Sequence, residues 1–180
     1  MASSDILTAQ HLDLRPFSEQ YLTPRYVAWL NDKETVRYSE QRHRAHTLES
    51  CRAYAASFAA SPSFFWAIVT HDPALGHIGN LTATVDAANR VADLAIVIGE
   101  RRARGLGLGL EAWRRACRFL LTEAGLRKVT AGTMATNEPM LRVMAASGMF
   151  EEGRRRRQFL HEGRAVDLVF TALFAEDIRD

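Results

Sequence analysis

A short segment rich in arginine and glycine, residues 101–109, has the residue types and spacing best suited to binding a charged group. Arg101, Arg102 and Arg104 surround a turn that has glycines at positions 105, 107 and 109. An amphipathic pattern follows, so we expect the turn to lead directly into a helix. The start of a helix offers unpaired N–H groups and the positive end of the helix dipole, and both attract anions. The segment therefore predicts a site for a phosphate or pyrophosphate.

The spacing of the glycines separates several interpretations of this turn. A P-loop requires GxxxxGK[ST], and the sequence contains no such run. The dinucleotide pattern GxGxxA fits Gly107, Gly109 and Ala112, but the acidic ribose ligand expected about 20 residues further on is missing from residues 124–137. The pattern [Q/R]xxGxG fits the run from Arg102 to Gly107. A solvated turn without a ligand is the remaining alternative.

The segments on either side of the turn read as a strand and a helix. Residues 91–98 are a near-continuous β-branched and aliphatic run closed by Gly99, which predicts a buried strand. From Leu106 onward, apolar residues recur at helical spacing and charged residues take the opposite face. The predicted apolar stripe consists of Leu106, Leu110, Trp113, Cys117, Leu120, Leu121 and Ala124.

The rest of the chain alternates between strand-like and helix-like periods. Further strands are predicted at residues 11–17, 64–70, 77–85, 128–134, 149–160 and 164–174, and helices at residues 19–30 after Ser18, after Thr47 and after Asn137. The three strands between residues 64 and 98 have short links and should be antiparallel, whereas the strand at 128–134 follows a crossover helix and should be parallel to its predecessor. Residues 36–47 are polar and non-periodic, and we interpret them as a functional loop.

Composition narrows the class of protein. With 180 residues, 47% of them hydrophobic, we expect one domain spanning residues 1–180. The net charge of +2 is too small to indicate general nucleic-acid binding. Cys51 and Cys117 lie in apolar helical patterns without metal-ligand spacing, so we expect neither a zinc site nor a disulfide. Because the sequence shows no signal peptide and no apolar run of membrane-spanning length, we expect a soluble cytoplasmic protein with no membrane partner.

The segment from Arg102 to Gly107, between a strand and a helix, resembles the acetyl-CoA-binding motif of the GNAT superfamily of N-acetyltransferases. The similarity extends along the chain, because the predicted order β-α-α-β-β-β-α-β-α-β-β is the order of that family. The segments LDLRPF, HIGNL and the stretch from Asn137 to Phe150 also resemble recurring family segments. The resemblance implies an α/β (α+β) fold with a mixed, mostly antiparallel, seven-stranded central sheet and about four helices. Among subgroups, the sequence is similar to the ribosomal-protein-alanine acetyltransferase-like branch.

The resemblance also implies acetyl-CoA as a cosubstrate, with no metal. Carried over by position, the backbone of Ile96, Val97 and Ile98 would pair with the pantetheine arm as an added strand does. The pyrophosphate would be held by Arg102, Ala103, Arg104, Gly105, Leu106 and Gly107. Asn137 would contact the pantetheine arm near the thioester, although a simple helix N-cap is an alternative role for it.

The catalytic groups that the resemblance implies are less well defined. Many family members place a tyrosine, which protonates the departing thiolate, where this chain has Met144, so no general acid is assigned. A thiol of pKa about 8.5 leaves without full protonation. Asp93 and Glu40 are candidate general bases, acting directly or through water. The alternatives are that Asp93 pairs with an arginine on a neighbouring strand and that Glu40 lies in solvent.

The polar loop is the candidate acceptor site. Tyr38, Glu40, Arg42 and His43 combine groups that suit a polar acceptor such as a sugar nucleotide or a peptide terminus. For the reaction as a whole, we expect a small amine or amino sugar as the acceptor. His43, His46 and His77 could titrate near neutral pH, but each is more often an ordinary hydrogen-bonding residue.

Two alternative functions stay open at this point. The acceptor could be a protein N-terminus instead of a small molecule. The expected partner is therefore an amine, carried either by a small molecule or by a peptide. The chain could instead be a non-catalytic CoA-binding or RNA-associated module, which the residue Met144 and the run Arg154–Arg157 favour. The same run is explained by a charged edge strand, and we expect no nucleic-acid partner. A homodimer is also left open.

Overall fold

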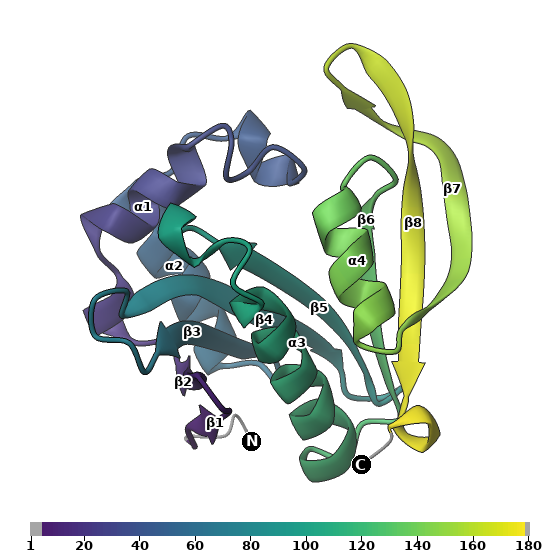
Figure 1. The fold of residues 1–180 in the computed structure, drawn as a ribbon, viewed down its shortest axis with the longest axis horizontal. Coiled ribbons are helices and arrows are strands. Elements are labelled where there is room, and N and C mark those ends of the chain that lie inside the picture. Colours follow the sequence, from purple (N-terminus) through teal and green to yellow (C-terminus); the bar gives the residue numbers. More distant parts are fainter. Residues whose placement is uncertain (1–4, 179–180) are drawn as a thin grey trace.

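One mixed sheet of eight strands crosses the molecule in the computed structural model, which describes residues 5–178 (Figure 1). The strands lie in the order β1-β2-β3-β4-β5-β6-β8-β7, and every neighbouring pair is antiparallel except β5 and β6. The strands are β1 Leu7–Thr8, β2 Leu12–Pro16, β3 Phe64–Thr70, β4 His77–Asp86, β5 Val91–Ile98, β6 Lys128–Met134, β7 Phe150–His161 and β8 Arg164–Phe174. This confirms the predicted fold class and the single parallel pair after the crossover helix.

The described residues form eight strands rather than the predicted seven, because the short strand β1 is added at one edge of the sheet. Leu7 pairs with Leu14 and is only 2% exposed. A strand of two residues is too short to show alternation in the sequence. Strand β1 is buried because Leu7 packs into the same apolar core as Leu14.

The described residues contain four α-helices, α1 Pro24–Asn31, α2 Leu48–Ala59, α3 Leu108–Arg118 and α4 Glu138–Ala146. The predicted helix at residues 19–30 is wrong in its start: residues 19–21 form a 3₁₀ turn, and Ser18 makes no side-chain cap. Thr23 caps α1 instead, its hydroxyl accepting from the Tyr26 N–H at 3.2 Å. Pro24 favours this start, because proline has no N–H to lose and its φ suits the first helical position. The predicted caps Thr47 and Asn137 are confirmed.

Helix α3 starts two residues later than its apolar stripe suggested. Leu106 is 61% exposed and lies in the turn, not on the buried face. Gly105 and Gly107 have φ values of +78° and +80°, which are incompatible with a right-handed helix, so the helix can begin only at Leu108. A π-helical turn, Phe119–Glu123, extends the far end.

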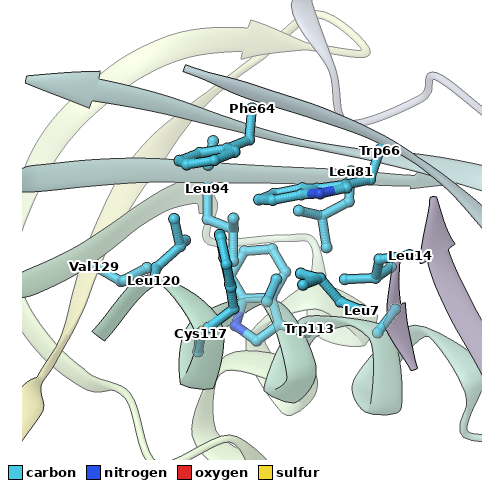
Figure 2. Close-up of a cluster of buried hydrophobic side chains, with 14 of the residues drawn as sticks. Leu7, Leu14, Phe64, Trp66, Leu81, Leu94, Trp113, Cys117, Leu120 and Val129 are labelled. Carbon is cyan, nitrogen blue, oxygen red and sulfur yellow. The ribbon is translucent and has the colours of Figure 1, made fainter. Parts of the chain in front are cut away.

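Each face of the sheet carries its own apolar cluster. On one face, Trp66 and Leu81 pack against Trp113 of α3, as Figure 2 shows. On the other face, Phe65 packs against Tyr26 and Trp29 of α1 and Cys51 of α2. The two helical layers therefore hold the sheet between them, and α3 crosses the near face in Figure 1. Within residues 5–178, no helix is long and apolar enough to span a membrane.

Strand β5 is buried on one face only, which corrects the prediction of a buried strand. Leu94 is buried, whereas Asp93 and Ala95 are exposed. In the β4–β5 register, Asp93 lies opposite Thr84, Ala95 opposite Thr82 and Val97 opposite Asn80. Paired residues share a face of the sheet. The exposed face of β5 thus continues onto a polar row on β4.

Candidate active site

The parallel strands β5 and β6 separate after three residue pairs. The register joins Val91, Ala92 and Asp93 to residues 128–130 and then stops. Figure 1 shows the two strands starting side by side and moving apart along their length. Among residues 5–178, Ile96, Val97 and Ile98 therefore have no strand partner on this edge, and part of their backbone hydrogen-bonding capacity is open on that side. The Ile98 carbonyl accepts from the Arg104 guanidinium at 3.2 Å.

The turn after β5 exposes the start of α3. Gly107 is the N-cap in a left-handed conformation, and having no side chain it cannot cap the first-turn N–H groups. A Cβ built on Gly105 or Gly107 would meet nothing within 4 Å. The positive φ angles therefore require these glycines, while the space beside them is open. The turn has the uncapped N–H groups and the room that an anion needs.

The three arginines of the turn are tied to neighbouring segments. Arg101 pairs with Asp32 at 3.2 Å, and the Arg104 guanidinium donates to the Thr35 hydroxyl at 2.7 Å. Arg102 pairs with Glu100 at 3.2 Å. The Arg102 N–H and the nearby guanidinium groups hold the pKa of the Glu100 carboxyl below its usual range. These contacts fix the turn against the loop that follows α1, and all three guanidinium groups stay at the surface.

Asp93 lies where β5 and β6 begin to separate. Its Oδ2 accepts from the Thr130 hydroxyl at 2.9 Å. The side chain has access to solvent, yet the surrounding protein removes enough water to raise the pKa of Asp93 above its usual value, and the Thr130 hydrogen bond opposes that shift. No arginine pairs with Asp93 among the described residues, so the arginine partner considered from sequence is absent there. A carboxylate with a raised pKa is a stronger base than an ordinary aspartate.

The four predicted acceptor residues gather around a 3₁₀ turn, Glu40–His43. Glu40 is 56% exposed and pairs with Arg42 at 2.8 Å, while His43 Nε2 lies 3.9 Å from its carboxylate. Arg42 also donates to the Leu160 carbonyl at 3.1 Å, and the Tyr38 ring lies 5.2 Å from that of His161. These contacts bring the loop against the end of β7. We call this cluster of Tyr38, Glu40, Arg42 and His43 the rim.

A cleft of about 300 Å³ lies beside the rim, between α1, α2, the polar loop and strands β3–β5. Its lining includes no rim residue; the loop contributes the neighbouring Ser39, Gln41, Arg44, Ala45 and His46 instead. The apolar and aromatic wall is formed by Tyr26, Leu30, Cys51, Tyr54 and Phe65. The rest of the cleft lining consists of Ser50, of Asn80 and Thr82 from β4, and of residues 95–97 from β5. The lining residue of β5 nearest to Asp93 in sequence is Ala95, so the cleft ends two positions along the strand from Asp93.

The sequence contains one signal for the cleft, in strand β4. Asn80 and Thr82 are polar residues at alternate positions of the otherwise largely apolar β4. Asn80 Oδ1 lies 3.0 Å from His77 Nε2. Burial lowers the pKa of His77, which leaves the imidazole neutral at pH 7, so we assign its Nε2–H as the donor. A polar alternation on a strand with one covered face indicates a site rather than core.

The remaining predicted residues have clear structural roles. Asn137 caps α4 through the Met140 N–H at 3.3 Å, and its Nδ2 donates to the Thr133 hydroxyl at 2.9 Å. Met144 is 2% exposed and belongs to the core, so it offers no acid. Among the described residues, no group of three or more His, Cys, Asp or Glu side chains is placed to hold a metal.

The arginine run on β7 is held largely by its own hairpin. Arg154 forms a bidentate pair with Glu151 at 2.7 and 2.9 Å, and the Arg155 guanidinium lies 5.1 Å from the Phe170 ring centroid. Strand β7 pairs with β8 and is the outer strand of the sheet in the described part of the chain. These contacts fit a charged edge strand, which discourages pairing with other chains.

Comparisons with known proteins agree with this geometry. A family model described as an acetyltransferase (GNAT) domain matches residues 11–150. No curated protein sequence matches the chain. Similar solved structures include a GNAT-family acetyltransferase from Bacillus anthracis, with a TM-score of 0.80 at 18% identity over 96% of this chain and 99% of that one.

Two further structures are similar over nearly their whole length. A ribosomal-protein-S5-alanine acetyltransferase from Vibrio fischeri has a TM-score of 0.81 at 16% identity, covering 98% of this chain and 100% of that one. A spermidine N-acetyltransferase from Vibrio cholerae, in complex with CoA and spermine, has a TM-score of 0.82 at 17% identity, covering 93% and 97%. At these identities the likeness establishes a shared fold.

Proposed function

The chain belongs to the GNAT acetyltransferase family, and from that premise we propose that it transfers the acetyl group of acetyl-CoA to the amine of a small acceptor by direct attack on the thioester. One observation carries the proposal. The edge of β5 that separates from β6 leads directly into the uncapped start of α3. A strand edge followed by an anion site matches a ligand with amide groups at one end and a pyrophosphate further along.

The residues present fit acetyl-CoA in two places. The open edge at Ile96–Ile98 offers backbone groups to the amides of the pantetheine arm. The turn at Gly105–Gly107 offers first-turn N–H groups and free space to the pyrophosphate, with the arginines of the turn at its border. Asn137 is placed in this proposal beside the arm, where its amide already bonds Thr133. Acetyl-CoA supplies the activated carbonyl, and the chain supplies its alignment.

Asp93 is the general base in this proposal. An amine must lose its proton to attack a carbonyl, and a carboxylate with a raised pKa accepts that proton more readily than an ordinary one. Thr130 holds the carboxylate by a hydrogen bond at the point where the strands separate. Glu40, which is paired with Arg42 at the surface, is the less suitable base. The thiolate leaves without an acid from the chain at position 144.

The acceptor is assigned to the cleft. A volume of about 300 Å³ suits a small molecule such as an amine or amino sugar. One of the similar structures is a spermidine acetyltransferase, so polyamines are a class of small amine to include in a screen. A protein N-terminus is a second candidate, because the rim beside the cleft offers Tyr38 and Arg42 to the residues of a longer substrate.

Calorimetry with acetyl-CoA tests the cosubstrate assignment. We expect the double variant Gly105→Glu, Gly107→Glu to lose binding, because two carboxylates would repel the pyrophosphate. The matched control is Gly125→Glu, Gly163→Glu, which places the same side chains at positive φ values of +71° and +76° in open space elsewhere. The control should bind like the wild type. Equal affinity in all three proteins would contradict the assignment of this turn to the pyrophosphate.

A screen of acceptors tests the activity itself. The release of free CoA thiol is followed with amino sugars, amino acids, polyamines and short peptides. We expect release that depends on one of these amines. A protein that binds acetyl-CoA tightly but acetylates none of them would favour a non-catalytic binding module.

A further inference from the structure

The charge of the cleft lining is one-sided. Arg44 is its one permanently charged side chain, and no aspartate or glutamate is among the described residues that line it. Within residues 5–178, the Arg44 side chain has no hydrogen bond or ion pair, while Arg42 two residues earlier is paired with Glu40. An arginine at a cleft without a protein carboxylate is free to bind an anion from the ligand.

A second lining residue also lacks a partner. His46 Nε2 is buried and has no hydrogen bond in the described part of the chain. The backbone of His46 is fixed from both sides, because its N–H donates to Asn31 Oδ1 and its carbonyl accepts from Asn31 Nδ2, each at 2.9 Å. A buried polar atom without a partner is costly, so a ligand group that bonds it gains affinity. Arg44 and His46 thus present two basic side chains from one short segment.

The rest of the lining fits the uncharged body of a ligand. Tyr26, Tyr54 and Phe65 supply aromatic surface, and Ser39, Gln41, Ser50, Asn80 and Thr82 supply neutral hydrogen-bonding groups. A polyamine would bring several positive charges into a cleft that has a cation and no carboxylate. Arg44 would repel the positive charges of the polyamine, and no carboxylate in the lining would pair with them.

Building on the proposed function, we propose that the acceptor is an amine that also carries a carboxylate or phosphate, and that Arg44 selects it by pairing with that anionic group. The anionic group lies at Arg44 with His46 beside it, the body of the acceptor lies against the aromatic wall, and the amine points toward the end of the cleft nearest Asp93. Arg44 is then a specificity-determining residue.

Equilibrium binding to the CoA-loaded protein tests this inference without depending on turnover. Calorimetry compares two matched pairs of amines: L-phenylalanine with L-phenylalaninamide, and glucosamine 6-phosphate with glucosamine. Spermidine is the polycationic probe. We expect the anionic member of one pair to bind about tenfold or more tightly than its neutral partner and than spermidine. The pair that shows this preference identifies the anion as a carboxylate or a phosphate.

Substitutions at Arg44 distinguish direct pairing of Arg44 with the anionic group from a general effect of the protein's positive charge. Arg44→Gln should abolish the preference, and Arg44→Lys should keep part of it. Arg52→Gln removes the same charge from α2 outside the cleft and should change nothing. The inference is overturned if spermidine binds more tightly than the anionic amines, if no anionic amine is preferred, or if Arg44→Gln retains the preference. A protein that fails to bind CoA at all would instead contradict the proposed function, and the inference would fall with it.

Discussion

Asp93 shows how one residue acquires its chemistry from its position. Its neighbours in sequence are apolar, and in a strand covered on both faces it would be an unpaired buried charge. The structure leaves its face of β5 open and gives it one hydroxyl partner, Thr130, and no cation among the described residues. Its pKa is therefore raised by loss of water. The same feature that makes it a better base makes its ionised form costly.

This cost leads to a prediction for Asp93→Asn. A carboxyl whose pKa is raised on folding contributes stability at low pH that is lost as the pH rises through its unfolded and then its folded pKa. Above both values the ionised group is a net cost, which the neutral amide removes. We expect the melting temperature at pH 7 to be unchanged or higher, while kcat falls by about 100-fold or more.

Thermal melts at several pH values and steady-state acetylation assays measure the two effects. Thr84→Ser on the paired strand is a suitable control, because it keeps a hydroxyl on the same face. A variant with near wild-type kcat would show that Asp93 is not the base. A large loss of stability of Asp93→Asn at pH 7 would show that the ionised carboxylate of Asp93 does not destabilise the folded protein.

Residues with local roles were predictable, and residues of the cleft were not. Thr47 and Asn137 act as N-caps, a role that depends on the next three or four residues. Arg44 and His46 line the cleft only because the polar loop folds against α2 and β4, which no local pattern encodes. The sequence therefore predicts the polar loop, but its pattern points to the rim residues rather than to the neighbours that line the cleft.

At the level of elements, the end of β5 is held by contact with α1. The Gly99 N–H donates to the Ile78 carbonyl at 2.9 Å, so the backbone is fixed where the strand ends. The indole of Trp29 lies against this glycine, and a Cβ built there would come within 2.0 Å of the ring. Helix α1 thus packs on the peptide that leads into the turn.

The contact predicts a strong effect for Gly99→Ala. One added methyl group must displace either Trp29, which is buried, or the backbone of β5. We expect the free energy of unfolding to fall by about 1–3 kcal/mol, the usual cost of overpacking. Affinity for acetyl-CoA should also fall, because the displaced backbone carries the turn.

Urea denaturation and calorimetry measure these two quantities. Gly153→Ala on β7 is the matched control, since a Cβ at that position meets nothing within 4 Å and its φ is not positive. Equal stability of the two variants would mean that α1 moves aside freely.

Elements with a long, clear period were predicted well. The expected bounds at residues 64–70, 91–98 and 128–134 match β3, β5 and β6. The errors arose where backbone geometry overrides side-chain pattern. The positive φ of Gly105 and Gly107 delays α3 beyond Leu106, and Pro24 sets the start of α1. β1 is defined only by its partner β2.

At the level of the whole molecule, the sheet separates two helical layers with different tasks. The layer with α3 covers the larger apolar core and carries the turn that we propose binds the pyrophosphate. The layer with α1 and α2 forms a smaller cluster and walls the cleft. Strands β5 and β6 stop pairing beyond Asp93, and under the proposed function the cosubstrate and the acceptor meet near that point.

His77 ties the second layer to the sheet and predicts how the whole protein responds to acid. Its ring lies 5.0 Å from Tyr21 and 5.1 Å from Trp29, and Nε2 bonds Asn80. Burial lowers its pKa below 6.5, and Arg25 adds to this effect. A histidine whose pKa is lowered on folding contributes stability that is complete above its unfolded pKa and is lost as the pH falls through that value. The wild type should therefore lose stability between pH 7 and pH 5.

His77→Gln should flatten this dependence, because glutamine keeps a hydrogen-bond donor and does not titrate. The comparison is made by urea denaturation at pH 7, 6 and 5, with His43→Gln on the exposed rim as the control that retains the wild-type slope. If the curves for His77→Gln and the wild type run parallel, another group is responsible for the acid sensitivity. If they converge as the pH falls, protonation of His77 is what loosens the layer that walls the cleft. Acceptor affinity should then decline over the same pH range in the wild type and less steeply in the variant.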